Sequence, residues 1–300
     1  MIERARVTPT QVIEDDIDPG SGPIFFPGKL IIKGNVPDKS EIQTNDGIEI
    51  HGTVGAASLR THGDILIRGG ASGPGYIDAR RDIRLRFVEN STVVSGRNLI
   101  VEASAMHSQL SAGHKIIVTS AKGVLVGGVA KAGMTISAVK IGSHLYTRTE
   151  LQVGIHPLLR SEEVRLTQRI DQIEQNRDAI QRNIEYLEGL VPENTSEKMA
   201  KRVGKIPLMR LRVKHLSTEL SKVVNRHKTL REVLDAQTKR GQIDVIREIF
   251  PGVIMTIDWT TLELKEHLKS VTFVEQGGEI LWESLHLAST SEEELEIEDL

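Results

Sequence analysis

The sequence contains no cysteine, which excludes disulfide bonds, thiolate metal ligands and a cysteine nucleophile. Aromatic residues make up only 3% of the chain, although apolar residues as a whole reach 39%. Any core must therefore be filled by isoleucine, valine, leucine and alanine. Small or branched side chains stacked in register suit a narrow repetitive architecture better than a globule built around tryptophan and phenylalanine. The composition favours a repeat protein.

Long hydrophobic runs are also missing. No segment approaches the roughly 18 apolar residues of a membrane span. The N-terminal stretch MIERARVTPTQVIEDDIDPG lacks the apolar run of a signal peptide. We therefore expect a cytoplasmic protein with no membrane span. The formal net charge of -3 argues against attraction of the whole protein to nucleic acid.

A repeated pattern occupies the first half of the chain. Similar combinations of apolar residues and a small or polar corner recur at 42–50, 59–67 and 77–85, and looser copies follow. Equivalent positions of successive copies lie about 16 to 20 residues apart, which is long enough for one coil of a stack. These positions are Leu30, Ile48, Ile65, Ile83, Leu99, Ile116 and Ile136.

Each copy has the features of a short strand followed by a corner. Alternation of apolar and polar residues indicates a strand with one face inward. The small residue with its following Gly, Asn or His indicates a corner, where glycine or asparagine supplies the positive φ of a tight turn. The sequence therefore predicts a mainly β fold, a parallel β-solenoid with ladders of equivalent side chains. An antiparallel sandwich is the alternative, but it does not require the same corner in every copy.

After Pro157 the period of the apolar residues changes from two to about 3.5. One apolar stripe spans 166–191 and a second spans 209–234, with Arg177 and His227 as polar interruptions. The polar segment between them contains a helix breaker and an N-cap signal. The sequence predicts an inserted antiparallel coiled-coil hairpin with arms about 40 Å long. Arg177 and His227 would set the register of its two helices.

These patterns divide the chain into five parts. They are an N-terminal lead-in (1–23), the β-solenoid (24–157), the helical hairpin (158–240), returning strands that complete or cap the solenoid (241–285) and an acidic tail (286–300). The strand pattern resumes at Ile243. A terminal cap is expected because an uncovered solenoid end is an open edge.

The turn and the second helix of the predicted hairpin carry basic residues with almost no acid between them. The candidate partner-binding residues are Lys201, Arg202, Lys205, Arg210, Arg212 and Lys214. Such a surface can recruit a protein partner, or it can bind a phosphate backbone or anionic lipid. Alternatively, it is a solvated helix face that complements the more acidic first helix and the tail at Glu292 to Asp299.

Several segments together resemble the flagellar assembly protein A family of bacterial β-solenoid proteins. They are GKLIIKGNVPDKSEIQTNDGIEIHGTV at 28–54, VEASAMHSQLSAGHKIIV at 101–118, GVLVGGVAKAG at 123–133, IGS at 141–143 and IFPGV at 249–253. The resemblance extends from about Ile13 to Trp282. Its specific part is the order of solenoid, helical hairpin and returning strands.

The resemblance implies a right-handed β-helix with a coiled-coil arm in a cytoplasmic bacterial protein, associated in some members with flagellar assembly or placement. Family members often carry a further domain before the solenoid, and here that region is expected to be shortened to the stretch around Asp15 to Gly22. The family offers no catalytic residue, cofactor or metal site to carry over. The expected function is a non-catalytic scaffold or adaptor that forms homo-oligomers through its solenoid and recruits protein partners through its hairpin.

An enzymatic alternative comes from six-residue steps such as Ile42, Ile48 and Val54, which mimic the hexapeptide repeat of left-handed β-helix acyltransferases. Such an enzyme uses a histidine as general base, and carbonic anhydrase-like relatives bind zinc through three histidines. The candidates are His51, His62, His107, His114 and His144. The coil length varies and the six-residue step fails around Glu89 and Lys122. The sequence therefore favours a non-enzyme and argues against nucleic acid as a partner.

Overall fold

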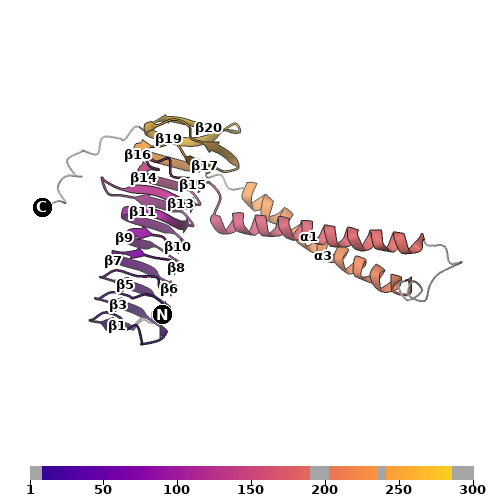
Figure 1. The fold of residues 1–300 in the computed structure, drawn as a ribbon, viewed down its shortest axis with the longest axis horizontal. Coiled ribbons are helices and arrows are strands. Elements are labelled where there is room, and N and C mark those ends of the chain that lie inside the picture. Colours follow the sequence, from indigo (N-terminus) through magenta and orange to yellow (C-terminus); the bar gives the residue numbers. More distant parts are fainter. Residues whose placement is uncertain (1–8, 190–202, 236–240, 286–300) are drawn as a thin grey trace, which may run out of the picture. The chain divides into compact units, whose positions relative to one another are not determined.

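The computed structural model describes residues 9–189, 203–235 and 241–285. The chain divides into two compact units. The first comprises Met1–Pro157 together with Lys239–Leu300, and the second comprises Leu158–Thr238. The first unit is a stack of parallel strands, and the second is a pair of helices (Figure 1).

The first unit is a β-solenoid in which each coil pairs with the coils before and after it through parallel strands. One ladder begins with β1 against β3 and continues, coil by coil, to β14 against β16. Its strands are β1 (Thr10–Ile13), β3 (Lys29–Ile32), β5 (Gly47–Ile50), β7 (Asp64–Ser72), β9 (Ile83–Glu89), β11 (Asn98–Ala112), β12 (Lys115–Val118), β14 (Thr135–Ile141) and β16 (Gln242–Ile249).

Two further ladders give the solenoid its other faces. The longer one includes the end of β11 and runs from β2 to β17. Its other strands are β2 (Ile24–Phe26), β4 (Glu41–Thr44), β6 (Ser58–Thr61), β8 (Tyr76–Ala79), β10 (Thr92–Ser95), β13 (Val124–Ala132), β15 (Thr149–Val153) and β17 (Val253–Ile257). The shorter ladder begins with single bridges from Val36 to Val54 and from Val54 to Ala71. It continues through parts of β7, β9, β11, β13, β14 and β16.

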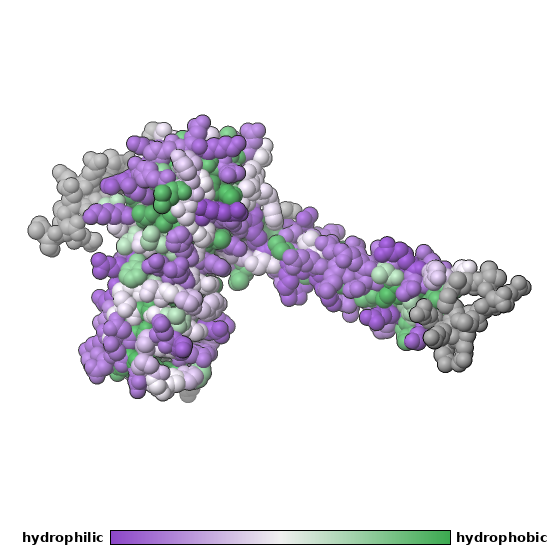
Figure 2. Space-filling view, in the orientation of Figure 1, coloured by the Kyte–Doolittle hydropathy of each residue, from purple (hydrophilic) through white to green (hydrophobic). Residues whose placement is uncertain are grey.

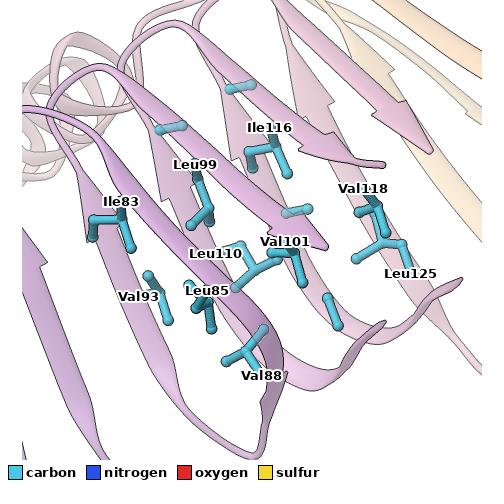
Figure 3. Packing of buried hydrophobic residues seen from close by; sticks show 14 of the residues in the cluster. Ile83, Leu85, Val88, Val93, Leu99, Val101, Leu110, Ile116, Val118 and Leu125 are labelled. Carbon is cyan, nitrogen blue, oxygen red and sulfur yellow. The ribbon is translucent and has the colours of Figure 1, made fainter. Parts of the chain in front are cut away.

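The core consists of columns of inward-facing aliphatic side chains. The equivalent residues predicted from the repeat are Cα partners in consecutive coils, from Leu30 opposite Ile48 to Ile116 opposite Ile136. Each member of this column is at most 1% exposed. Figure 3 shows the part of the core around Leu99. The predicted mainly β solenoid, with one repeat in each coil, is confirmed.

Close packing of the coils explains the glycines at one corner of the solenoid. Gly96, Gly113 and Gly133 occupy this corner in three consecutive coils, and none of them has the positive φ expected from the sequence. A Cβ atom on Gly113 would lie 2.1 Å from the carbonyl oxygen of Gly96, and one on Gly133 would lie 2.1 Å from that of Gly113. The expectation of positive φ at these corners was therefore wrong. The coils approach so closely that a side chain would collide with the backbone of the preceding coil.

The helices are inserted at this same corner, between β15 and β16. After the insertion, Ile243 pairs with Ile136 and Val253 pairs with Thr149, so the parallel ladders continue in register. The chain leaves and returns at two glycines that face each other. A Cβ atom on Gly241 would lie 2.7 Å from the Cα atom of Gly154. The helical segment thus replaces one corner and leaves the strands of the solenoid in place.

The two ends of the solenoid differ. At the C-terminal end, antiparallel strands cover the last coil, because β18 pairs with β17 and β19 pairs with both β16 and β20. These strands are β18 (Thr260–Glu263), β19 (Leu268–Gln276) and β20 (Glu279–Ser284). At the N-terminal end, β1 pairs only with β3, and β2 only with β4, within the described part of the chain. The solenoid sheet therefore reaches Thr10, before the start at Ile24 expected from the sequence, and no described strand pairs with the outer edge of its first coil.

The second unit contains α1 (Pro157–Glu188) and α3 (Ile206–Asp235). Ion pairs join Arg169 to Glu219 and Arg210 to Glu188. Because residue numbers fall along α3 as they rise along α1, the two helices run antiparallel. The predicted helix breaker, the N-cap signal and the end of the first apolar stripe fall in 190–202, outside the described residues.

Candidate functional site

The basic residues predicted to bind a partner gather at the start of α3. Lys201 and Arg202 lie outside the described residues, whereas Lys205 directly precedes α3 and the other three lie within its first turns. All four described residues are exposed. Arg210 Nη2 donates to Glu188 Oε1 of α1 at 2.7 Å. Arg210 therefore has an intramolecular role.

The other described basic residues of this set are exposed and have no ion-pair partner among the described residues. Within the described ranges, Lys205, Arg212 and Lys214 form no ion pair. No aspartate or glutamate occurs from residue 203 to residue 218. The start of α3 is thus a cationic surface whose charge is only partly compensated by α1.

Two leucines on α3 belong to this surface and were missed by the sequence reasoning. Leu208 is 67% exposed and Leu211 is 51% exposed. Leu211 lines a shallow groove together with Lys214, His215 and Thr218. Figure 2 shows that the visible face of the helices is chiefly hydrophilic, with short hydrophobic patches. The signal for these leucines was available, because they lie three residues apart and outside the apolar stripe of the helix pair.

The polar residues predicted at the contact between the helices have different surroundings. Arg177 donates through its guanidinium to Asp178 Oδ1 at 2.8 Å, on its own helix. His227 Nε2 lies 3.3 Å from Glu163 Oε1, and Arg231 Nη2 lies 3.4 Å from the same oxygen. Glu163 is only 8% exposed, so this carboxylate joins α1 to α3 near their ends. The sequence reasoning identified His227 but missed its partner Glu163.

The candidate histidines of the enzymatic alternative lie at separate places on the solenoid. They are His51, His62, His107, His114 and His144. His51 Nε2 lies 3.1 Å from Glu49 Oε1, whereas the ring of His144 packs 4.4 Å from that of Phe250. His62 lines a shallow hollow with Arg60 and Arg80. Across the described part of the chain, no group of three or more His, Asp or Glu side chains is arranged to hold a metal ion.

Glu49 is the centre of an ion-pair cluster that connects three consecutive coils. Lys29 on β3 donates to Glu49 Oε2 at 2.8 Å, and Arg68 on β7 donates to Glu49 Oε1 at 3.2 Å. The hydrogen bond from Lys29, with those from Arg68 and His51, lowers the pKa of Glu49 to about 2 despite the opposing effect of burial. The carboxylate therefore stabilises the stacking of coils, which is a structural role.

His156 lies at the corner from which the chain leaves the solenoid. Its Nε2 atom would be 2.8 Å from a Cβ atom on Gly113, so the ring packs against this corner glycine. Burial lowers the pKa of His156, and the charge of nearby His114 lowers it further. The neutral form of the ring is therefore favoured in the folded protein.

Among the helices that the structure describes, none is long and apolar enough to cross a membrane. The arrangement defines a class of protein, namely a parallel β-solenoid built from one chain with a pair of helices inserted at one corner. The family model of the flagellar assembly protein A β-solenoid domain matches residues 9–280. The chain belongs to this family, and the resemblance inferred from the sequence is confirmed. Comparisons with curated proteins and with solved structures gave no match.

Proposed function

We propose that this protein is a non-catalytic scaffold and adaptor in flagellar assembly or cell-pole organisation in the bacterial cytoplasm. The observation that carries the proposal is the unbroken register across the helical insertion, where Ile243 continues the column of Ile136. A solenoid that keeps its register can serve as a rigid support, while the inserted helices offer a separate surface to a protein partner. Membership of the flagellar assembly protein A family supports the cellular role.

The finer features of the architecture are part of the same proposal. The solenoid is right-handed, as parallel strand crossovers generally are. The antiparallel helices form a coiled coil, and His227 and Arg177 fix its register. The five-part division expected from the sequence describes how the chain is organised, with the first strand of the solenoid moved forward to Thr10.

Self-association through the N-terminal end of the solenoid is the second element of the proposal. The outer edges of β1 and β2 have no partner strand within the described residues, while antiparallel strands cover the opposite end. Val12 and Phe25 are exposed on these strands. A second copy that meets the same edge would pair the free backbone groups and bury these side chains. Because the described residues leave one end of the solenoid unpaired and cover the other, the expected product is a closed dimer.

Light scattering coupled to size-exclusion chromatography tests this association over a range of protein concentrations. We expect dimers that dissociate on dilution and that are lost in the double variant Val12→Lys and Phe25→Lys. Leu145→Lys is the control, because Leu145 is also exposed but lies in the loop between β14 and β15. A protein that remains monomeric at all concentrations, or dimers that persist in the edge variant, would contradict the proposed interface.

The cellular role is tested by deleting the gene in the bacterium that encodes this chain. We expect fewer or misplaced flagella and slower swimming, with recovery on expression of the full chain. A chain without residues 158–238 should retain the solenoid register and fail to restore motility. Normal flagellation and swimming in the deletion strain would refute the role in flagellar assembly.

A further inference from the structure

The exposed leucines of α3 lie away from its partner helix. Successive residues turn by about 100° around an α-helix, which places Leu208 and Leu211 roughly 140° from the stripe of Met209, Val213 and Leu216. Those stripe residues are half-buried, whereas both leucines are more than half exposed. The two leucines therefore form a small apolar patch on the outer face of α3.

Cationic side chains flank this patch on both sides. Arg212 follows Leu208 by four residues, and Lys214 follows Leu211 by three, so each cation is a direct neighbour of a leucine. The helical turn places Arg212 and Lys214 on opposite margins of the patch. Both are exposed, and neither forms an ion pair with any described residue.

This combination favours one kind of ligand over the other candidates. A phosphate backbone would engage the cations but would not cover leucines. Binding of a further helix would require a longer apolar surface. On this face of α3, however, the residues that follow Leu208 and Leu211 are His215, Thr218 and Lys222, which are polar. An anionic lipid surface fits both parts, since the leucines can enter the boundary of the acyl chains while the cations remain among the headgroups.

We propose that the first half of α3 docks on an anionic lipid bilayer, with Leu208 and Leu211 inserted and with Arg212 and Lys214 bound to lipid headgroups. The contact is made by one face of the helix, which lies along the lipid surface. The inference deepens the adaptor role proposed above by naming what the basic part of the helical segment contacts. The contact would bring the protein to a membrane surface through α3.

Vesicle flotation of the purified full-length protein tests this contact. The probes are vesicles of phosphatidylcholine mixed with phosphatidylglycerol, compared with vesicles of phosphatidylcholine alone. We expect binding to the anionic vesicles only. The pair Arg212→Gln and Lys214→Gln should weaken it by about 30-fold, since each cation near an anionic surface contributes roughly a fivefold effect. The pair Leu208→Gln and Leu211→Gln should weaken it by about tenfold or more.

A matched control removes the same charge elsewhere. Lys115→Gln with Lys122→Gln takes two exposed cations from the solenoid and should leave vesicle binding unchanged. Circular dichroism of each variant checks that the helices are retained. Equal binding to both kinds of vesicle, or binding that is insensitive to the leucine pair, would overturn the proposal. So would binding to short duplex DNA that depends on the cations and exceeds binding to the anionic vesicles.

Failure of this inference is distinguishable from failure of the proposed function. The flotation assay contains no flagellar component, and the deletion assay contains no test of lipid affinity. A strain that depends on the gene for motility, combined with a protein that does not bind anionic vesicles, would retain the scaffold role and reject the lipid contact. Loss of vesicle binding in the Leu208→Gln and Leu211→Gln variant, with the helices intact, would support the contact directly.

Discussion

Replacing Leu99 with alanine removes a side chain from the centre of the solenoid column. Leu99 pairs with Ile83 in the preceding coil and with Ile116 in the following coil, and it is fully buried. Parallel ladders on both sides hold the backbone, so the surrounding coils can collapse only partly into the space. Leucine-to-alanine changes at such sites cost about 2.7 to 5 kcal/mol, and we expect about 3 to 4 kcal/mol here.

The neighbouring residue supplies a control on the same strand. Ile100 is only half-buried and faces outward, so Ile100→Ala should cost less than about 1.5 kcal/mol. Urea unfolding followed by circular dichroism gives both free energies of unfolding by linear extrapolation. An equal loss of unfolding free energy in the two variants would refute the assignment of Leu99 to the interior and Ile100 to the outer surface of the solenoid.

Because each coil contacts only its neighbours, the same change should also have a local effect. Hydrogen exchange should accelerate most at the amides of the coils that contain Ile83 and Ile116, and less toward the ends of the stack. A uniform acceleration along the whole solenoid would show that the coils unfold as one cooperative unit. The local measurement therefore separates the energy of the column from the cooperativity of the stack.

Three further changes test the corner and the two ion-pair clusters. A Cβ atom on Gly96 would lie 2.1 Å from the carbonyl oxygen of Arg80, so Gly96→Ala should cost about 2 kcal/mol or more in urea unfolding. At Gly20 a Cβ atom would make only ordinary contacts, at 3.6 Å or more from the Asp18 carboxylate, so Gly20→Ala should change stability by less than about 0.5 kcal/mol. The pKa of Glu49 falls from 4.5 to about 2 on folding, so its contribution of about 3 kcal/mol is present above pH 4.5 and is lost as pH falls toward 2. The stability gap between wild type and Glu49→Gln should therefore shrink in acid. Glu163→Gln should lower the melting temperature of the helices, because His227 loses a carboxylate partner.

The column of the solenoid could be predicted from the sequence because every coil contributes the same kind of residue to it. Large aliphatic side chains at Leu30, Ile48 and Ile65 form a regular pattern in the sequence, since their positions recur at a nearly constant spacing. The face with the shorter ladder has no such repeated pattern in the sequence. Its inward residues include Val54 and Ala71, which differ in size and are joined by single bridges.

Other features depend on contacts that no local pattern reveals. The first strand escaped prediction because three of the four residues of Thr10–Ile13 are exposed, so its apolar alternation is weak. The corner glycines were identified, but the reason for them was not, because the close approach of two coils is a property of the stack. At the candidate site, the basic residues were predicted from charge alone, whereas the role of Arg210 depends on Glu188, a residue from the other helix.

The position of the helical insertion explains how this protein can combine a stable support with a variable contact surface. An insertion within a strand would remove an inward side chain from a column and break ladder hydrogen bonds on both sides. At the corner between Gly154 and Gly241 it does neither, because the pairing of Ile136 with Ile243 continues across it. The residues that hold the solenoid together are therefore separate from those that form the outer face of α3. Substitutions at Leu208 or Arg212 that impair motility would thus report on the contact made by the helix, since they leave the core of the solenoid unchanged.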